Sequence, residues 1–241
     1  MEESFARVEI KYMLTPDQQA AMADGLRQYG FQWMDFGDPA VQSLYYDTPD
    51  HRLIRDSLER PMYKEKLRLR AYGRPGAQTT SFVEVKKKYD GVVYKRRVAL
   101  PLQAAYQGLS GGCLPPEAGQ VGREAQWMVK RYGLIPSAVI AYDRDAWFSD
   151  QWPDVRITFD RNLTFRDHDF DLRANACGLP LMKPDQRLME IKTSGVYPLW
   201  LARLLWDTQV KRIHYSKYGL AYLKYIQEKE SNPRKEASSY V

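Results

Sequence analysis

The sequence predicts an α+β domain in which antiparallel strands close into a barrel with a charged interior and with helices packed outside. Charged and aliphatic residues alternate in several segments, among them Lys66–Arg70 and Arg156–Asp160. Because the side chains of a strand point alternately to opposite faces, each such segment has an ionic face and an apolar face. The dipeptide Asp90–Gly91, which lies between two alternating segments, is typical of a two-residue hairpin turn.

The first elements are predicted from local signals in chain order. Alternation at residues 7–11 predicts a strand. Thr15 and Pro16 then supply an N-cap and a first-turn proline, and an apolar-periodic run ends at Gly30, so residues 15–29 are predicted to be helical. Further alternating segments predict strands at residues 41–47, 62–72, 80–89 and 92–100.

The middle of the chain, residues 101–133, is predicted to be a connector because it contains several prolines and the Gly111–Gly112 break. Within it, residues 123–132 predict a helix that stops at Gly133. The remaining predicted elements are strands at 138–148, 154–161 and 186–193, a helix at 197–206, and a last helix at 216–229 with Ser216 as its N-cap.

Composition indicates one domain. With 241 residues, of which 44% are hydrophobic, the chain is long enough for one sizeable core, so we expect a single domain over residues 1–241 with a frayed tail at 228–241. The two cysteines lack the spacing of a zinc site and fit a reducing compartment. No segment reaches the roughly 18 apolar residues of a membrane span, so we expect a cytoplasmic protein without a membrane span.

The hairpin also predicts a register. A two-residue turn at positions 90–91 fixes which residues of the two strands face each other. The predicted partners are Lys88 with Val93, Lys86 with Lys95, and Glu84 with Arg97. Four basic side chains therefore crowd on one face of this pair of strands beside a single carboxylate.

The ionic faces have two interpretations. An antiparallel sheet commonly has one solvated face, so the alternating charges can simply face water. Strands closed into a barrel would instead enclose a cationic tunnel, and the aliphatic residues would form an outer wall covered by helices. The dominance of Arg and Lys favours the tunnel. Crowded cations repel by several kcal/mol per close pair at low effective dielectric, so such a tunnel makes sense only with an anion inside it.

The number of basic residues indicates a ligand with several phosphates, which also fits the net charge of +6. Planar Arg side chains bind phosphate bidentately, and Lys side chains act as point charges between them. The candidate phosphate-binding residues are Lys11, Lys66, Arg68, Arg70, Lys86, Lys88, Arg97, Arg144, Arg156 and Lys192. Glu9, Glu84 and Glu190 would be unfavourable beside phosphate unless Mg²⁺ or Mn²⁺ bridges them.

Short motifs that carry a family resemblance occur in order along the chain: Glu9–Tyr12, Leu44–Thr48, Lys66–Tyr72, Phe82–Lys88, Arg156–Asp160, Leu188–Lys192 and Ser216–Gly219. This series resembles the VTC domain, the catalytic domain of vacuolar transporter chaperone polyphosphate polymerases, in its stand-alone bacterial form. The resemblance covers about residues 4–225, which is the expected ordered core. The family belongs to the triphosphate tunnel metalloenzymes, also called CYTH-like, so the resemblance implies a closed barrel whose charged lumen binds a triphosphate and a metal.

The resemblance implies a phosphotransferase that moves the γ-phosphate of ATP to a growing inorganic polyphosphate chain, with ADP released and Mn²⁺ or Mg²⁺ required. The positions that match phosphate-binding lumen residues of the family are Lys11, Arg68, Arg70, Lys86, Arg144 and Arg156. Glu190 matches the metal-binding glutamate, and Lys217 matches the lysine near the reacting phosphate. We expect Lys217, Arg70 and Glu190 to be catalytic, and Glu9 to assist Glu190 with the metal.

Lys217 also has an argument of its own. A lysine in the first turn of a helix is unfavourable with the helix dipole. A phosphate bound there would supply a reason for it.

Two alternatives to the polymerase stay open. A tripolyphosphatase or nucleoside triphosphatase would use the same tunnel, but Arg7 stands where the opening motif of the tunnel enzymes has its first carboxylate. Arg7 in place of that carboxylate indicates fewer metal ligands than in the hydrolytic relatives, which favours the polymerase. The other alternative is a polyphosphate-binding protein without turnover. Nucleic acid is disfavoured as a partner because the residues beside the cations are mainly aliphatic, whereas base stacking needs aromatic ones.

Overall fold

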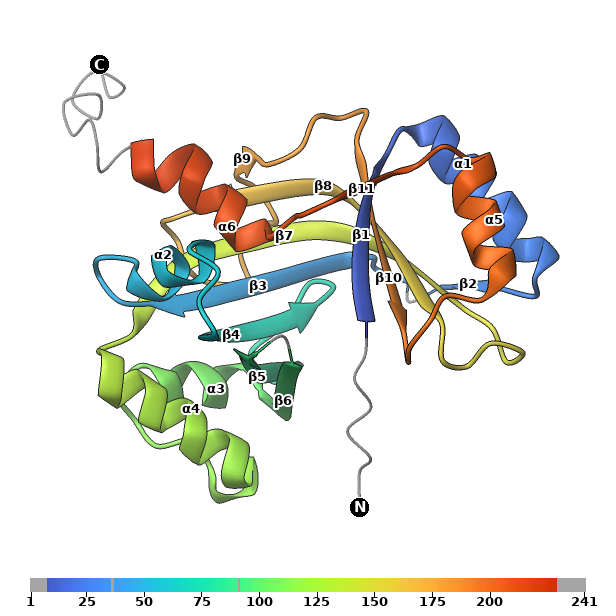
Figure 1. Cartoon of the computed structure of the whole chain (residues 1–241). Coiled ribbons are helices and arrows are strands. Elements are labelled where there is room, and N and C mark those ends of the chain that lie inside the picture. Colours follow the sequence, from blue (N-terminus) through green and yellow to red (C-terminus); the bar gives the residue numbers. More distant parts are fainter. Residues whose placement is uncertain (1–7, 36, 91, 229–241) are drawn as a thin grey trace.

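The computed structural model describes residues 8–35, 37–90 and 92–228, which form an α+β fold around one antiparallel sheet of eleven strands (Figure 1). Along its main path, the strands in spatial order are β11 (Lys211–Ile213), β1 (Val8–Leu14), β10 (Arg187–Thr193), β8 (Arg156–Arg166), β7 (Ile135–Phe148), β3 (Ala40–Asp47), β4 (Tyr63–Tyr72), β5 (Thr80–Tyr89) and β6 (Val92–Pro101). Two short strands lie off this path: β2 (Gln32–Met34) pairs with β7, and β9 (Leu179–Pro180) pairs with β8.

The sheet curves but does not close into the expected barrel. Its edge strands are β11 and β6, and within the described residues no backbone pairing joins β6 to β1 or β11. The outer edge of β1 is partly covered by β11, which pairs with Lys11–Met13, and β6 forms the other edge of the sheet. Figure 1 shows β1 crossing β7 and β8 steeply in this view, so the sheet bends around its concave side without a continuous ring of hydrogen bonds.

The predicted hairpin register is confirmed. In the β5–β6 pair, Lys88 lies opposite Val93, Lys86 opposite Lys95, and Glu84 opposite Arg97. Of the two turn residues, Asp90 has a positive φ of 43°, as such a turn requires, and Gly91 lies outside the described residues. Alternation and turn chemistry are local, which is why this register could be read from the sequence.

Three of the predicted helices form close to their predicted positions. α1 (Pro16–Gln28) begins with a capping box, in which the Thr15 hydroxyl accepts from the Gln18 N–H and the Gln18 side chain accepts from the Thr15 N–H. α4 (Gly119–Tyr132) starts four residues earlier than predicted and ends at Gly133, whose φ of 63° is left-handed. α5 is Leu199–Asp207.

The sequence prediction missed several elements. The N-terminus of α2 (Arg52–Leu58) is stabilised by a residue that precedes the helix. The Asp47 carboxylate at the end of β3 accepts hydrogen bonds from the N–H groups of Leu53 and Ile54. α3 (Leu102–Leu109) and the 3₁₀ turn η1 (Pro116–Ala118) lie in the stretch predicted to be a connector. No side chain caps α3, so its start carried no local signal.

The apolar face of the sheet is covered by two pairs of helices. Leu67 and Leu69 of β4 and Val83 and Val85 of β5 pack against α3 and α4. At the other end, β8 and β10 pack against α1 and α5, and the sheet residues of that core include Ile157, Phe159, Met189 and Ile191. These are the aliphatic positions between the charged ones, so the outer wall predicted from the alternation forms as expected.

One helix departs from the prediction that helices lie only outside. α6 (Lys217–Ala221), which continues into the π-helical turn η2 (Tyr222–Ile226), lies on the concave side of the sheet. The ring of Tyr218 stacks on that of Tyr45 in β3, with ring centroids 4.7 Å apart, and Ala138, Ile140 and Phe165 belong to the same apolar cluster. Part of the concave side is therefore apolar and filled by α6.

Some predictions concern the ends of the chain. Arg7 and residues 229–241, which make up nearly all of the predicted tail, lie outside the described residues. Within the described part, no helix combines the length and the apolar composition needed to cross a membrane. Cys113 and Cys177 are exposed and free.

Replacing Leu69 by Ala tests the outer wall. Leu69 is fully buried beneath α3 and α4, so Leu69→Ala should lower the free energy of unfolding by about 2–5 kcal/mol through lost contacts and a cavity. Urea denaturation at constant pH measures the change. Leu199→Ala, at a leucine that is 67% exposed, should cost less than about 1 kcal/mol. Equal losses in the two variants would contradict this packing.

Candidate anion-binding site

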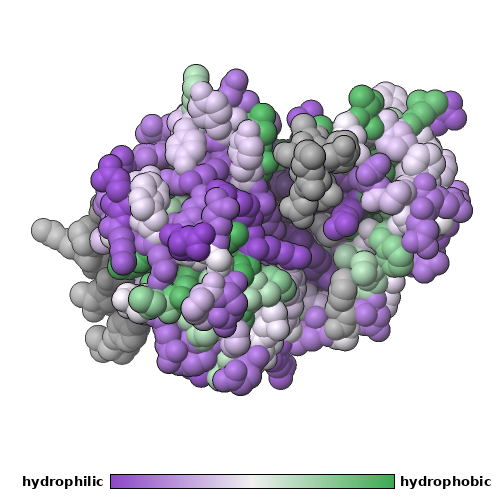
Figure 2. All heavy atoms as spheres, turned by 90° about the horizontal axis from the view of Figure 1, so that it is seen from below, coloured by the Kyte–Doolittle hydropathy of each residue, from purple (hydrophilic) through white to green (hydrophobic). Residues whose placement is uncertain are grey.

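The ionic faces of the strands meet on the concave side of the sheet, opposite the face that the helices cover. We call the basic residues predicted for this face the cation cage: Lys11, Lys66, Arg68, Arg70, Lys86, Lys88, Arg97, Arg144, Arg156 and Lys192. Figure 2, seen from below, shows hydrophilic residues around a hollow near the centre of this face of the molecule. The charged faces therefore line a chamber and do not simply form an outer solvated surface.

Glu190 on β10 is a centre of negative charge in this chamber. Its carboxylate accepts a hydrogen bond from the Lys217 Nζ at 2.8 Å. It also pairs with Lys11 at 3.6 Å, Arg144 at 3.4 Å and Lys192 at 3.8 Å. Burial alone would raise the pKa of Glu190, but these cations, Lys217 first, hold the pKa well below its usual range. Glu190 is therefore ionised and shared among several basic groups.

Asp160 on β8 is a second, fully buried carboxylate. It binds the Arg144 guanidinium through two hydrogen bonds of 2.7 and 2.8 Å and lies 2.6 Å from the Lys217 Nζ. Burial would raise the pKa of Asp160, whereas Arg144 and Lys217 lower it overall. Asp160 thus fixes the positions of two basic side chains of the site, and it was not among the predicted site residues.

Lys217 is explained by these carboxylates. It is the first residue of α6, and the Ser216 hydroxyl caps this helix by accepting from the Gly219 N–H. The structure gives the lysine in the first turn of α6 two partners within the protein, because Asp160 and Glu190 supply negative charge beside it. That a phosphate also binds there stays a prediction. Burial would lower the pKa of Lys217, but the two carboxylates raise it above its usual range.

The side of the chamber formed by β4, β5 and β6 carries less negative charge. Glu84, which is almost fully buried, pairs with Arg68 at 2.6 Å and with Lys95 at 2.7 Å. Burial would raise the pKa of Glu84, but Arg68 first, then Arg70 and Lys95, lower it strongly. The Arg70 Nε donates to the Ser43 hydroxyl, and no carboxylate of the described residues lies within ion-pair distance of its guanidinium. Arg70 is therefore a buried cation held by a neutral partner.

Tyr45 on β3 lies among these cations, although the sequence prediction gave it no role. Its hydroxyl accepts a hydrogen bond from Arg68 at 3.1 Å, and its ring stacks on that of Tyr218. Burial would raise the pKa of the phenol, but Arg68, Arg70 and Lys66 lower it to about 8. A phenol with such a pKa changes its charge close to physiological pH.

The two sides of the chamber act on each other electrostatically. Burial tends to raise the pKa of Glu9 on β1, but Lys86 across the chamber and Lys11 beside it, at 3.2 Å, lower the pKa overall. Burial lowers the pKa of Lys66 to about 8, and the like charges of Lys86 and Lys11 add to the effect. Burial also lowers the pKa of Lys192, and Lys86 contributes to that shift. Although the sheet is open, charged groups on its two sides therefore shift each other's pKa.

The remaining predicted residues lie at the margins of the cage. Arg97 on β6 faces Glu84 across the strands, and its guanidinium lies 4.7 Å from the ring centroid of Phe82. Arg156 is opposite Lys192 at one end of β8, and it is exposed. Lys88 lies near the hairpin end of β5 and is half-buried. These three residues share the charged face, but the described residues show no ion pair for them.

Glu190 and Glu9 offer the oxygen ligands that Mg²⁺ and Mn²⁺ prefer. Both carboxylates lie within 4 Å of the Lys11 Nζ, so the two groups converge on one place. Within the described residues, no cluster of three or more acidic, His or Cys side chains could hold a metal. Two carboxylates suit a cation such as Mg²⁺, which usually keeps water and substrate phosphates in its coordination shell. The donor set therefore fits a metal that binds together with a phosphate ligand.

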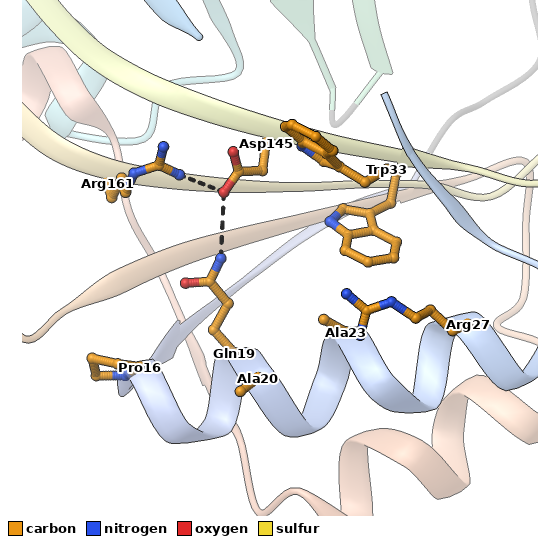
Figure 3. A pocket seen from close by; sticks show the side chains of 9 residues that line it. Pro16, Gln19, Ala20, Ala23, Arg27, Trp33, Asp145 and Arg161 are labelled. Carbon is orange, nitrogen blue, oxygen red and sulfur yellow. Dashed lines mark hydrogen bonds and ion pairs between the residues drawn. The ribbon is translucent and has the colours of Figure 1, made fainter. Parts of the chain in front are cut away.

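A separate groove lies on the outer face, between α1 and the strands β7 and β8 (Figure 3). It has a volume of about 440 Å³. Its lining residues are Pro16, Gln19, Ala20, Ala23, Arg27, Trp33, Asp145, Trp147 and Arg161. Asp145 pairs with Arg161 and accepts from Gln19, and Arg27 pairs with Asp24 outside the groove, so the charged residues of this groove have partners. The cation cage lies on the other face of the sheet.

Comparisons with known proteins agree with this fold. The sequence matches the family model of the VTC domain over residues 6–226. No curated protein matches it. A solved structure of a candidate adenylate cyclase from Vibrio parahaemolyticus is 15% identical, with a TM-score of 0.51 over 90% of this chain and 98% of that chain. A second candidate adenylate cyclase, from Bacillus halodurans, is 13% identical, with a TM-score of 0.54 over 92% and 98%. At these identities the likeness to the two structures concerns the fold alone.

Replacing Asp160 by Asn tests the buried charge cluster. Asp160→Asn keeps the shape of the side chain but leaves Arg144 and Lys217 short of negative charge, so the free energy of unfolding at pH 7 should fall by about 3 kcal/mol. Urea denaturation measures this loss. Because the pKa of Asp160 is lowered in the folded protein, its stabilisation is full above its ordinary pKa and is lost as the pH falls through the folded-state value.

Asp24→Asn is the matched control for this cluster, because Asp24 pairs with Arg27 on the exposed surface of α1. It should change the free energy of unfolding by less than about 1 kcal/mol. If Asp160→Asn is as mild as Asp24→Asn, the cluster does not contribute to stability as argued.

Proposed function

Because the chain belongs to the VTC domain family, we propose that it is a polyphosphate polymerase. The proposed reaction transfers the γ-phosphate of ATP to a growing chain of inorganic polyphosphate. An oxygen of the terminal phosphate of the chain forms a bond to the γ-phosphorus, the bond from this phosphorus to the β–γ bridging oxygen breaks, and ADP leaves. The family match over residues 6–226 and the basic chamber support this proposal.

The observation that carries the proposal is the surplus of basic groups on the side of β4 and β5. Lys66, Arg70 and Lys86 line this side, and within residues 8–228, apart from positions 36 and 91, no carboxylate forms an ion pair with them. The carboxylate of Glu84 is already shared by Arg68 and Lys95. A linear chain of phosphates would place negative charge beside each of these basic groups along this side, whereas a single phosphate would reach only some of them.

The proposed reaction requires mainly that the protein neutralise charge and position the phosphates. Phosphoryl transfer is accelerated mainly by neutralising the charge on the transferred group and by aligning the attacking and leaving oxygens. We assign Arg70 and the neighbouring Arg68 to the phosphate oxygens, and Lys217 to the reacting phosphate. Asp160 and Glu190 hold Lys217 in place before the phosphate arrives. A base is not needed, because the attacking phosphate oxygen is already an anion.

We assign the metal to Glu190 and Glu9, with phosphate oxygens and water completing its coordination. When bound there, Mg²⁺ or Mn²⁺ would neutralise negative charge on the phosphates. Glu190 pairs with Lys217, Lys11 and Arg144 in the structure, so it would bind a metal beside basic groups that would contact the phosphates.

Incubation with ATP and Mn²⁺, with the products resolved by gel electrophoresis and phosphorus NMR, tests the polymerase. Long phosphate chains and ADP are expected from the natural sequence. Lys11→Ala, Arg70→Ala and Glu190→Ala should each lower the rate by about 100-fold or more because each removes a charge from the reacting centre. Circular dichroism checks that the variants fold, and Lys183→Ala, at an exposed loop lysine, serves as the control.

Other outcomes of this assay point to other functions. Release of free phosphate in place of polymer would identify a tripolyphosphatase or nucleoside triphosphatase. Tight polyphosphate binding without turnover would identify a binding protein. A folded protein that forms no polymer with any nucleotide or metal would overturn the proposed polymerase.

The affinity for inorganic tripolyphosphate should fall between pH 7 and pH 9. Lys66 and Tyr45 both have a pKa lowered to about 8, so a rise in pH removes a positive charge from the cage and adds a negative one. We expect roughly a tenfold loss of affinity for each change, which corresponds to about 1.4 kcal/mol. Tyr45→Phe should remove one of the two losses.

Isothermal titration calorimetry in buffers of different ionisation enthalpy measures both the affinity and the protons taken up on binding. Tyr94→Phe, at a tyrosine that is 50% exposed, is the control for removal of a phenol. Proton uptake that is the same in Tyr45→Phe as in the natural sequence would exclude a role of Tyr45 in the pH dependence.

A further inference from the structure

Lysines lie directly opposite one another on neighbouring strands of the charged face. Lys64 of β4 faces Lys88 of β5, and Lys66 faces Lys86 in the same pair of strands. Lys86 in turn faces Lys95 of β6. We call these five residues the lysine ladder. Its members on β4 and β5 are half-buried, so water screens their charges only in part.

Such an arrangement is unfavourable without a ligand. Like charges directly opposite in a sheet have Cβ atoms only about 5 Å apart and destabilise the pairing. Within the described residues, only Lys95 of the lysine ladder has a carboxylate partner, Glu84. Burial, with the like charges of Lys88, Arg60 and Lys86, lowers the pKa of Lys64. Lys64 and Lys88 therefore hold positive charge that the protein itself does not neutralise.

The ladder leads away from the reacting centre. Its inner rung, Lys66–Lys86, lies beside α6, since the Lys66 Nζ is 3.5 Å from the hydroxyl of Ser216, the residue before Lys217. Residues on one face of a strand are about 7 Å apart, so the outer rung, Lys64–Lys88, lies one such step farther out. There the Lys64 Nζ donates to the Ser57 carbonyl near the end of α2. The line from Arg70 to Lys64 spans about 20 Å, which is longer than a triphosphate.

We propose that Lys64 and Lys88 form a chain-holding subsite, which binds phosphate units of an inorganic polyphosphate beyond those at the reacting centre. The proposal deepens the proposed polymerase function and rests on it. A subsite of this kind binds a long chain better than a short one, because only a long chain reaches the outer rung while its other phosphates remain on the basic groups as far as Arg70. It would keep the growing polymer attached between successive transfers.

The neighbouring residues favour a phosphate chain over a single-stranded nucleic acid. Binding of nucleic acid would need aromatic rings beside the cations so that bases could stack. Tyr63 and Tyr89 are the aromatic neighbours of Lys64 and Lys88 in sequence, and they face each other across the same two strands. Alternation places both rings on the opposite face of the sheet. The charged face at the outer rung therefore offers charge without stacking surfaces.

The test compares the affinities for tripolyphosphate and for long-chain polyphosphate, measured by calorimetry without nucleotide. In the double variant Lys64→Gln/Lys88→Gln, the ratio of long-chain to tripolyphosphate affinity should fall at least tenfold. The salt dependence of long-chain binding should also become shallower by about 1.4, for two lost phosphate contacts. Lys64→Arg/Lys88→Arg should retain the ratio, and Lys130→Gln/Lys183→Gln, at two exposed lysines outside the ladder, is the matched control.

Equal losses of affinity for the short and the long ligand, or no loss for either, would overturn the subsite. A single-stranded RNA of similar charge that binds as tightly as the polymer, and that loses affinity equally in the double variant, would overturn the assignment to a phosphate chain. These readouts need no turnover. A failure to make polymer from ATP would therefore refute the proposed polymerase and still leave the length dependence of binding measurable.

Discussion

The buried pairing of Glu190 and Asp160 with Lys217 is the interaction on which the rest of the site depends. The two carboxylates come from β10 and β8, the lysine opens α6, and Arg144 of β7 joins them from a third strand. None of these charges would be tolerated alone at such a depth, because an uncompensated buried charge is strongly destabilising. Their mutual neutralisation holds α6 on the concave side of the sheet, where its apolar residues also find partners on β3 and β7.

The same pairing divides the chamber into two unlike halves. Around β10, β8 and α6, the carboxylates of Glu9, Asp160 and Glu190 all have basic partners before any ligand binds. Along β4 and β5, the positive charge of Arg70 and the lysines is larger than the negative charge of Glu84. This half therefore favours binding of an anion. In the proposed function, a metal would bind the carboxylates of the first half, and phosphates would bind the basic groups of the second. A ligand that carries both would contact both halves.

The open sheet does not weaken this arrangement, because electrostatic coupling across the chamber does not need a hydrogen-bonded seam. Lys86 acts on Glu9 and Lys192 from the opposite side. The aliphatic side chains that alternate with the charged ones in the strands lie on the outer face of the sheet, where two pairs of helices bury them. The fold is thus apolar between the sheet and its outer helices, and the concave side is ionic except where α6 packs on it.

The sequence by itself determined most of the long strands, the N-cap of α1, the β5–β6 register and the common face of the cationic residues. These features depend on alternation, caps and turns, which act between neighbours along the chain or across one tight turn. Only the tertiary structure decided that Asp160 joins Arg144 to Lys217, that Asp47 accepts hydrogen bonds from the start of α2 and that the sheet stays open between β11 and β6. These outcomes depend on which distant segments become neighbours, and a side chain such as Tyr45 acquires its lowered pKa only from the cations that the fold brings to it.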